Sequence, residues 1–310
     1  MDCFELYNGY LMPVIGYGTF PQKETLCDNI PIAYNLGYRM IDTSDNYLNE
    51  QFVGDGLSRI KSNDIVVVTK FSQPLRTYEF ETCFTESLNK VNKRGLIYLL
   101  HWPFPYLWRR QWRKMEDLYL KGECAAIGVC NFDVGYLKEL LMFCRVKPMI
   151  NQFERHPLFQ QKELVTLCQN ENIQVMSYSP LARMDAELSL NSTLIEIASK
   201  YSKTVNQIIL RWNIDTHCIP IPASSSEIHI RENINIFDFE LTEEEINEIN
   251  GLDCGKRIRF NPRTRFEGLE KLSFAIVGIK YECPITAKVL TVFYKIGNKI
   301  KKWSNGLLMK

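Results

Sequence analysis

Short apolar runs alternate with segments of helical period along most of this chain. Eight such runs lie at residues 13–19, 38–42, 65–70, 96–102, 126–132, 148–153, 173–178 and 217–222. Strands that alternate with helices build parallel sheets, because each crossover helix returns the chain to the same end of the sheet. Eight of these units in about 250 residues predict an α/β fold, the closed (β/α)8 or TIM barrel.

The two ends of the chain add to this barrel. Asn8-Gly9 lies between apolar residues, the pattern of a tight β-hairpin, and we expect this N-terminal hairpin to cap the bottom of the barrel. At the other end, residues 271–310 carry a net charge of +7, whereas residues 1–270 carry −6. The sequence therefore predicts a barrel domain over residues 1–270 and a basic C-terminal tail over residues 271–310.

The apolar residues of the tail recur at helical spacing. They are Ile285, Val289, Val292, Ile296, Ile300 and Trp303. Lysines stand one position before four of them, so the pattern predicts a basic amphipathic helix. Its apolar face could dock on the acidic barrel, or the helix could bind an anionic membrane surface or a partner protein.

Composition argues against several other classes of protein. A net charge of +1 gives no reason to expect a nucleic acid as partner. No apolar run reaches the roughly 18 residues of a membrane span. The ten cysteines include no CxxC pair, so no metal site is expected. Because no signal-peptide pattern precedes the first unit, we expect reduced thiols and a cytoplasmic location.

Polar side chains follow the predicted strands at the end of the barrel where chemistry takes place. Four titratable residues follow three neighbouring strands: Asp42, Tyr47, Lys70 and His101. Singly, each has a structural interpretation, as a helix cap, a packing residue, a solvated strand end or a core histidine. Together they suit the protonation of a carbonyl oxygen. Lys70, held by Asp42, would lower the pKa of Tyr47. A neutral His101 would orient the carbonyl group.

Motifs around these residues resemble those of one family. The stretches "LGYRMIDTSDNYLNE", "IVVVTK", "YLLHWP", "AIGVCNF", "INQFERHP" and "YSPL" occur in the order found in aldo-keto reductases. The resemblance extends from about residue 4 to residue 255. It implies NAD(P)H-dependent reduction of an aldehyde or ketone, a small-molecule carbonyl substrate, with Tyr47 as the general acid.

The resemblance also implies which residues bind the cofactor and the substrate. Those expected along the cofactor are Gly18, Thr19, Asp42, Cys130, Asn131, Gln152, Tyr178, Ser179, Pro180, Leu181, Ser224, His229, Glu232 and Asn233. Asn131 and Gln152 would hold the nicotinamide carboxamide, and Tyr178 would stack on its ring. Phe20 and Trp102 would form aromatic walls of the substrate pocket.

The chain departs from the family pattern at the cofactor site. Cys130 stands where the family usually has Ser. Ala223 and His229 stand where the family usually has the Lys and Arg that grip the 2′-phosphate of NADPH. Each lost charge-assisted hydrogen bond costs about 1.5–3 kcal/mol. The sequence therefore allows either NADPH or NADH as the cofactor.

Two further questions stay open at the level of sequence. Arg257, Arg259, Arg263 and Arg265 lie in the loop expected to border the substrate mouth, where they form either a solvated charge run or a site for anionic substrates. The altered cofactor loop and the added tail also fit a second class of function, a nucleotide-binding regulatory or interaction subunit with weak or no turnover. The complete set of four titratable residues favours the enzyme.

Overall fold

The computed structural model describes residues 2–266 and 268–280. Eight parallel strands pair in chain order. They are β3 (Tyr17–Gly18), β4 (Met40–Asp42), β5 (Val66–Phe71), β6 (Ile97–Leu100), β7 (Ala126–Cys130), β8 (Ile150–Glu154), β9 (Gln174–Tyr178) and β10 (Cys218–Ile221). The first and last strands meet, because the Gly16 and Gly18 amides donate to the Pro220 and Pro222 carbonyls at 3.1 and 2.9 Å. The predicted (β/α)8 barrel is confirmed.

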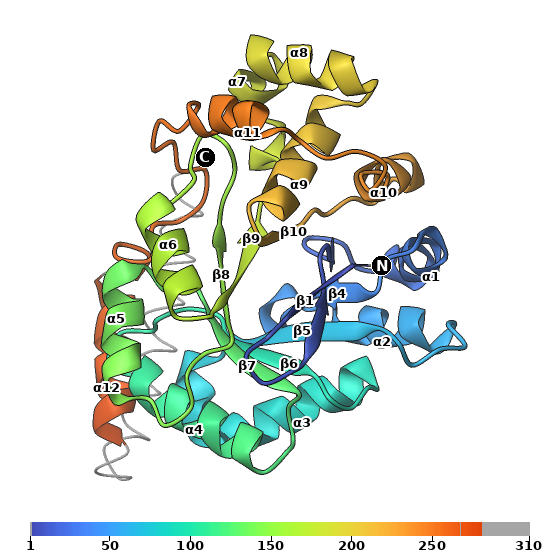
Figure 1. Cartoon of the computed structure of the whole chain (residues 1–310). Coiled ribbons are helices and arrows are strands. Elements are labelled where there is room, and N and C mark those ends of the chain that lie inside the picture. The colour runs from blue at the N-terminus through green and yellow to red at the C-terminus, as the bar shows by residue number, and fades with distance from the viewer. Residues whose placement is uncertain (1, 267, 281–310) are drawn as a thin grey trace, which may run out of the picture.

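Helices surround this barrel (Figure 1). They are α1 (Leu26–Leu36), α2 (Glu50–Ser58), α3 (Phe80–Val91), α4 (Trp108–Leu120), α5 (Val134–Phe143), α6 (Lys162–Asn170), α7 (Ala186–Ser189), α8 (Ser192–Tyr201), α9 (Val205–Asp215), α10 (Glu227–Ile234) and α11 (Glu243–Asn250). Several begin at side-chain caps, as at Thr204 and Thr242, where complete capping boxes satisfy the first amides of α9 and α11. Short 3-10 turns, η1 (Asp45–Tyr47), η2 (Pro74–Glu79) and η3 (Ala182–Met184), lie in loops at the carboxyl ends of strands.

The alternation of side chains along the strands positions the polar rim. Val66 and Val68 of β5 point into the barrel, where they pack in one apolar cluster with Met40 of β4. Because successive strand residues face opposite sides, Lys70 and Asp42 continue these inward-facing columns at the carboxyl ends of β5 and β4. Strand geometry alone therefore brings an ammonium and a carboxylate to the same end of the barrel interior.

The N-terminal hairpin closes the opposite end. β1 (Cys3–Glu5) pairs antiparallel with β2 (Leu11–Pro13), and Gly9 takes the left-handed conformation that the turn needs, with φ of 81°. Leu6 and Met12 are buried in the cluster that fills the barrel interior. The predicted hairpin cap is confirmed.

Helix α12 (Leu269–Lys280) crosses the domain boundary predicted after residue 270. Phe274 is buried, and its ring centre lies 5.7 Å from that of Phe104 and 5.2 Å from that of Phe266. The start of the predicted tail thus packs on the barrel. The apolar stripe from residue 285 to residue 303 lies outside the described residues, and the division into two domains stays a prediction. Among the residues described, no helix is both long and apolar enough to span a membrane.

Candidate active site

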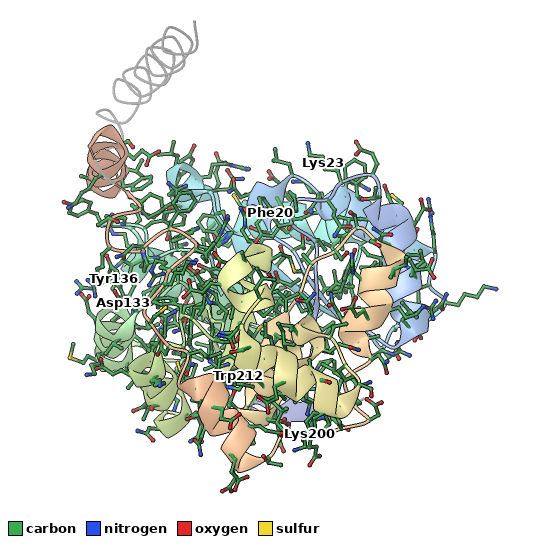
Figure 2. All side chains as sticks on the ribbon, turned by 90° about the horizontal axis from the view of Figure 1, so that it is seen from above. Phe20, Lys23, Asp133, Tyr136, Lys200 and Trp212 are labelled. Atoms are coloured by element: carbon green, nitrogen blue, oxygen red, sulfur yellow. The ribbon has the colours of Figure 1, made fainter. Side chains whose placement is uncertain are left out.

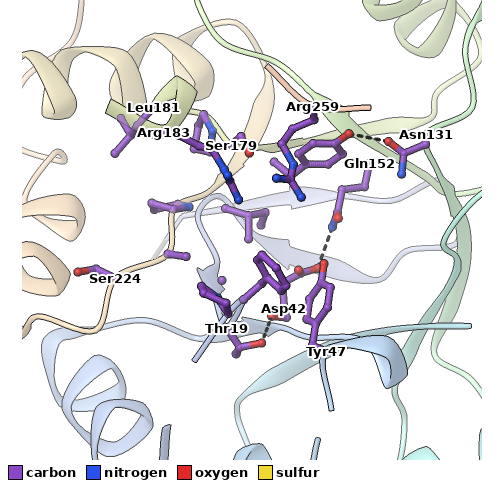
Figure 3. A pocket seen from close by; sticks show the side chains of 18 of the residues that line it. Thr19, Asp42, Tyr47, Asn131, Gln152, Ser179, Leu181, Arg183, Ser224 and Arg259 are labelled. Atoms are coloured by element: carbon purple, nitrogen blue, oxygen red, sulfur yellow. Dashed lines mark hydrogen bonds between the residues drawn. The ribbon is translucent and has the colours of Figure 1, made fainter. Parts of the chain in front are cut away.

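A pocket of about 620 Å³ opens at the carboxyl ends of the barrel strands (Figure 3). This volume falls within the range of about 300–1,000 Å³ that small-molecule and cofactor sites occupy. The predicted site residues that line it are Gly18, Thr19, Phe20, Asp42, Tyr47, His101, Trp102, Asn131, Gln152, Tyr178, Ser179, Pro180, Leu181, Ser224, His229 and Asn233. Three predicted residues do not line it: Lys70, Cys130 and Glu232.

Lys70 lies directly beneath the pocket, fully buried. Its Nζ donates to Asp42 Oδ1 and to the Thr43 carbonyl, each at 2.7 Å. Gln152 Nε2 donates to the other Asp42 oxygen at 2.8 Å. Burial by itself lowers the pKa of Lys70, but the charges of Asp42 and Tyr47 raise this pKa above its ordinary value. The buried ammonium therefore stays charged.

Tyr47 ends η1, the turn that follows β4. Its ring centre lies 5.1 Å from Lys70 Nζ and 5.8 Å from the centre of the His101 ring. Burial raises the pKa of the Tyr47 phenol to about 12, and the positive charge of Lys70 offsets only part of that rise. The lowering by Lys70 that the sequence predicted is thus outweighed by burial. At neutral pH the phenol is protonated, the form that a proton donor needs.

His101 follows β6 and is buried beside Tyr47. Burial is the main cause that holds the pKa of His101 well below its ordinary value, and the charges of Lys70 and Arg265 act in the same direction. The imidazole is therefore neutral at neutral pH. Its Nδ1 lies 3.1 Å from Ser44 Oγ and also within hydrogen-bond distance of Ser72 Oγ.

Ser44 and Ser72 are not among the site residues predicted from the sequence. The Ser72 amide also donates to the buried Asp45 carboxylate at 3.1 Å, so a polar network supports the His101 ring. Ser44 and Asp45 lie inside the motif around Tyr47, and Ser72 stands two positions after Lys70. Proximity to motif residues was the available signal. Only the folded chain shows that both serines reach His101 and that Asp45 binds Ser72.

Two amides lie at one end of the pocket. Asn131 takes a left-handed conformation with φ of 64°, and its Nδ2 donates to the His101 carbonyl at 3.0 Å. Its Oδ1 accepts from the Tyr178 hydroxyl at 2.6 Å. A dashed line at Asn131 in Figure 3 marks this hydrogen bond. Cys130 is buried beside them, with its Sγ 3.7 Å from Gln152 Oε1. Asn131 and Gln152 are therefore held in fixed orientations that face the pocket.

The loop after β10 lies at the other end of the pocket. Ser224, Ala223 and His229 line it there. Glu232 instead accepts from the Thr204 hydroxyl at 2.6 Å and lies 3.3 Å from His229 Nδ1. Glu232 thus joins α10 to the cap of α9, outside the pocket lining.

Arg183 is a pocket residue that sequence reasoning missed. It lies in η3 with φ of 56°, between Ala182 and Met184, which also have positive φ. Left-handed backbone at residues other than glycine is uncommon and marks constrained sites. Figure 3 shows its side chain beside Ser179 in the pocket. Its position two residues after the "YSPL" motif was the available signal.

A (β/α)8 barrel with a pocket at the carboxyl ends of its strands is the architecture of a barrel enzyme. The sequence profile of the Aldo/keto reductase family matches residues 9–253. The chain is 39% identical to glyoxal reductase of Bacillus subtilis over 84% of its own length and 96% of the relative. It is 35% identical to methylglyoxal reductase DkgA of Escherichia coli, over 83% and 96% of the two chains.

A solved structure agrees with these relatives. An aldo-keto reductase of Bombyx mori in complex with NADP superposes with a TM-score of 0.79 at 30% identity, over 84% of this chain and 95% of that one. The chain belongs to the aldo/keto reductase family. It is an NAD(P)H-dependent oxidoreductase that acts on aldehydes or ketones.

Proposed function

We propose that the chain reduces small aldehydes and ketones to alcohols, with Tyr47 as the proton donor. The observation that carries this proposal is the fully buried Lys70, paired with Asp42 at 2.7 Å and 5.1 Å from the centre of the Tyr47 ring. A buried ion pair is weak as a stabilising device, because desolvation of both charges offsets their attraction. Such a pair beside a titratable group in a pocket is typical of a functional site.

Each residue then has a defined task. A nicotinamide cofactor, when bound, would supply the hydride for the carbonyl carbon. Tyr47 donates its proton to the carbonyl oxygen, and the Lys70 ammonium stabilises the phenolate that remains. A serine hydroxyl that donates to Nδ1 of the neutral His101 leaves the ring proton on Nε2, which can donate to the carbonyl oxygen and orient it.

The names of two relatives suggest first substrates. Glyoxal and methylglyoxal are small dicarbonyl compounds, and we expect this chain to reduce one or both. The test is to follow oxidation of NADPH and of NADH by the purified protein with each compound. Steady consumption that depends on the carbonyl compound supports the proposal, whereas no consumption with either cofactor contradicts it.

The same pocket offers groups that suit a nicotinamide cofactor. We propose that Asn131 and Gln152 bind the carboxamide, since each amide retains hydrogen-bonding positions beyond those used by its protein partners. Tyr178 would stack on the nicotinamide ring. Ser224 and His229 at the far end would meet the adenosine half, where no lysine or arginine of the post-β10 loop lines the pocket within the described residues.

We expect NADH to be used at least as well as NADPH, because neither Ala223 nor His229 offers the lysine or arginine side chain that grips a 2′-phosphate. Ala223→Lys combined with His229→Arg should shift the ratio of kcat/KM values toward NADPH by about 10-fold or more for each cation. Ile228→Lys is a matched control, since Ile228 lies on the same helix but is 75% exposed and outside the pocket. Much tighter binding of NADPH than of NADH by the unmodified protein would show that this interpretation of the loop is wrong.

A further inference from the structure

The loop that follows α11 carries four arginines, and the structure divides them into two pairs. Arg263 makes two contacts with Asp133, from Nε to Oδ2 at 2.5 Å and from Nη2 to Oδ1 at 2.7 Å. Figure 2 shows Asp133 at the edge of the molecule, well apart from Phe20. Arg257 lies 3.8 Å from the buried Glu154 carboxylate. These two arginines therefore hold the loop onto the barrel.

Glu154 also holds the loop through its backbone. The Ile258 amide donates to Glu154 Oε1 at 2.6 Å, and the Arg259 amide donates to Oε2 at 3.0 Å. Glu154 is fully buried at the end of β8. Because this anchor fixes the backbone at Arg259, the side chain of Arg259 starts from a defined position at the rim of the pocket.

Arg259 and Arg265 are the other pair, and both line the pocket. Within the described part of the chain, neither guanidinium has a carboxylate partner, and Arg265 Nε is buried without any hydrogen-bond acceptor. Both are partly buried against aromatic rings: Arg265 Cζ lies 4.4 Å from the centre of the Phe260 ring. An unpaired, partly desolvated guanidinium in a pocket is an unsatisfied donor that an anion would satisfy.

The two charges lie at the reacting end of the pocket. Arg265 Cζ is 5.8 Å from the centre of the Trp102 ring, and Arg259 Cζ is 6.0 Å from that of Phe20. The positive charge of Arg265 lowers the pKa of His101, in addition to the larger lowering caused by burial and by Lys70. In Figure 3, Arg259 lies on the side of Asn131, away from Ser224. Arg259 and Arg265 thus face the expected place of the carbonyl substrate rather than the end of the pocket expected to bind adenosine.

We propose that the enzyme takes carbonyl substrates that carry a carboxylate, and that Arg259 and Arg265 bind this carboxylate while the carbonyl group lies at Tyr47 and His101. The planar guanidinium matches a carboxylate in geometry and in charge. This inference rests on the proposed function and names its substrate class. The carboxylate stays unchanged in the reaction, and the product is the corresponding hydroxy acid.

A matched pair of substrates tests this proposal. 4-Carboxybenzaldehyde and methyl 4-formylbenzoate have the same aldehyde, but only the first is charged. For the unmodified protein we expect the charged compound to have the higher kcat/KM. Arg259→Gln and Arg265→Gln should each lower the charged-to-neutral ratio of kcat/KM by about 10- to 100-fold, mainly through KM. Arg94→Gln, which removes the same charge from an exposed position outside the pocket, should leave the ratio unchanged.

A second measurement separates this proposal from the proposed function. Calorimetry with oxidised nicotinamide cofactor detects binding of 4-carboxybenzaldehyde without reduction. Both pocket variants should weaken that binding, whereas Arg94→Gln should not. If the ratios and the binding stay the same in Arg259→Gln and Arg265→Gln, the carboxylate site is refuted while the reductase remains. If the unmodified protein reduces neither aldehyde, the proposed function fails for these substrates, and the calorimetric comparison alone then decides the carboxylate site.

Discussion

Tyr47→Phe is expected to lower kcat for carbonyl reduction by about 10²–10⁴-fold, the range that general acid catalysis contributes. The change removes one oxygen atom and keeps the ring, so the contacts with Phe20 and His101 at centre-to-centre distances of 5.0 and 5.8 Å remain. The carbonyl oxygen then has no proton donor, because the neighbouring His101 is neutral and the Lys70 ammonium is paired with Asp42. Steady-state kinetics with a saturating carbonyl substrate measure this loss.

Cofactor binding separates a chemical effect from a structural one. Titration of NADPH or NADH should give nearly the same Kd for Tyr47→Phe as for the unmodified protein, because the pocket keeps its shape. Tyr106→Phe is a matched control, since Tyr106 is 61% exposed and lies outside the pocket lining, and its kcat should be unchanged. A Tyr47→Phe variant with near-normal turnover would exclude Tyr47 as the proton donor.

Among the proposed variants, Lys70→Met is expected to destabilise the protein most. It should lower the free energy of unfolding by about 3–5 kcal/mol. Methionine fills most of the same space, but it leaves the Asp42 carboxylate buried without the cation that lies 2.7 Å away in the unmodified protein. Gln152 Nε2 still donates to Asp42, and one neutral hydrogen bond does not offset a buried charge. Urea-induced unfolding measures the change.

A double variant tests the cause of this loss. Asp42→Asn combined with Lys70→Met removes both charges, so the combined loss of stability should be smaller than the sum of the two single losses. Lys61→Met, at an exposed position, should change the stability by no more than about 0.5 kcal/mol. If the single losses simply add, an uncompensated charge on Asp42 is not the reason for the instability of Lys70→Met.

Local patterns in the sequence were sufficient to predict the barrel and most of its rim. Eight apolar runs between helical segments predicted the order of the strands, because hydrophobic periodicity reports directly on which residues face the core. The motifs around Asp42, Tyr47, Lys70 and His101 also predicted which side chains gather at one end, since parallel strands end together. These features depend on neighbours in the chain or on a repeating unit, so they can be recognised directly in the sequence.

Other properties of the site depend on contacts between distant segments, which exist only in the folded chain. Burial in the folded pocket outweighs the effect of Lys70 and raises the pKa of Tyr47 to about 12, a balance that no motif reveals. The four arginines of the closing loop look alike in the sequence, but Asp133 and Glu154 from other parts of the barrel neutralise Arg263 and Arg257. Arg259 and Arg265 meet no such carboxylate in the described part of the chain and face the pocket instead. Desolvation and charge pairing are set by distances through space, and the order of residues along the chain does not contain these distances.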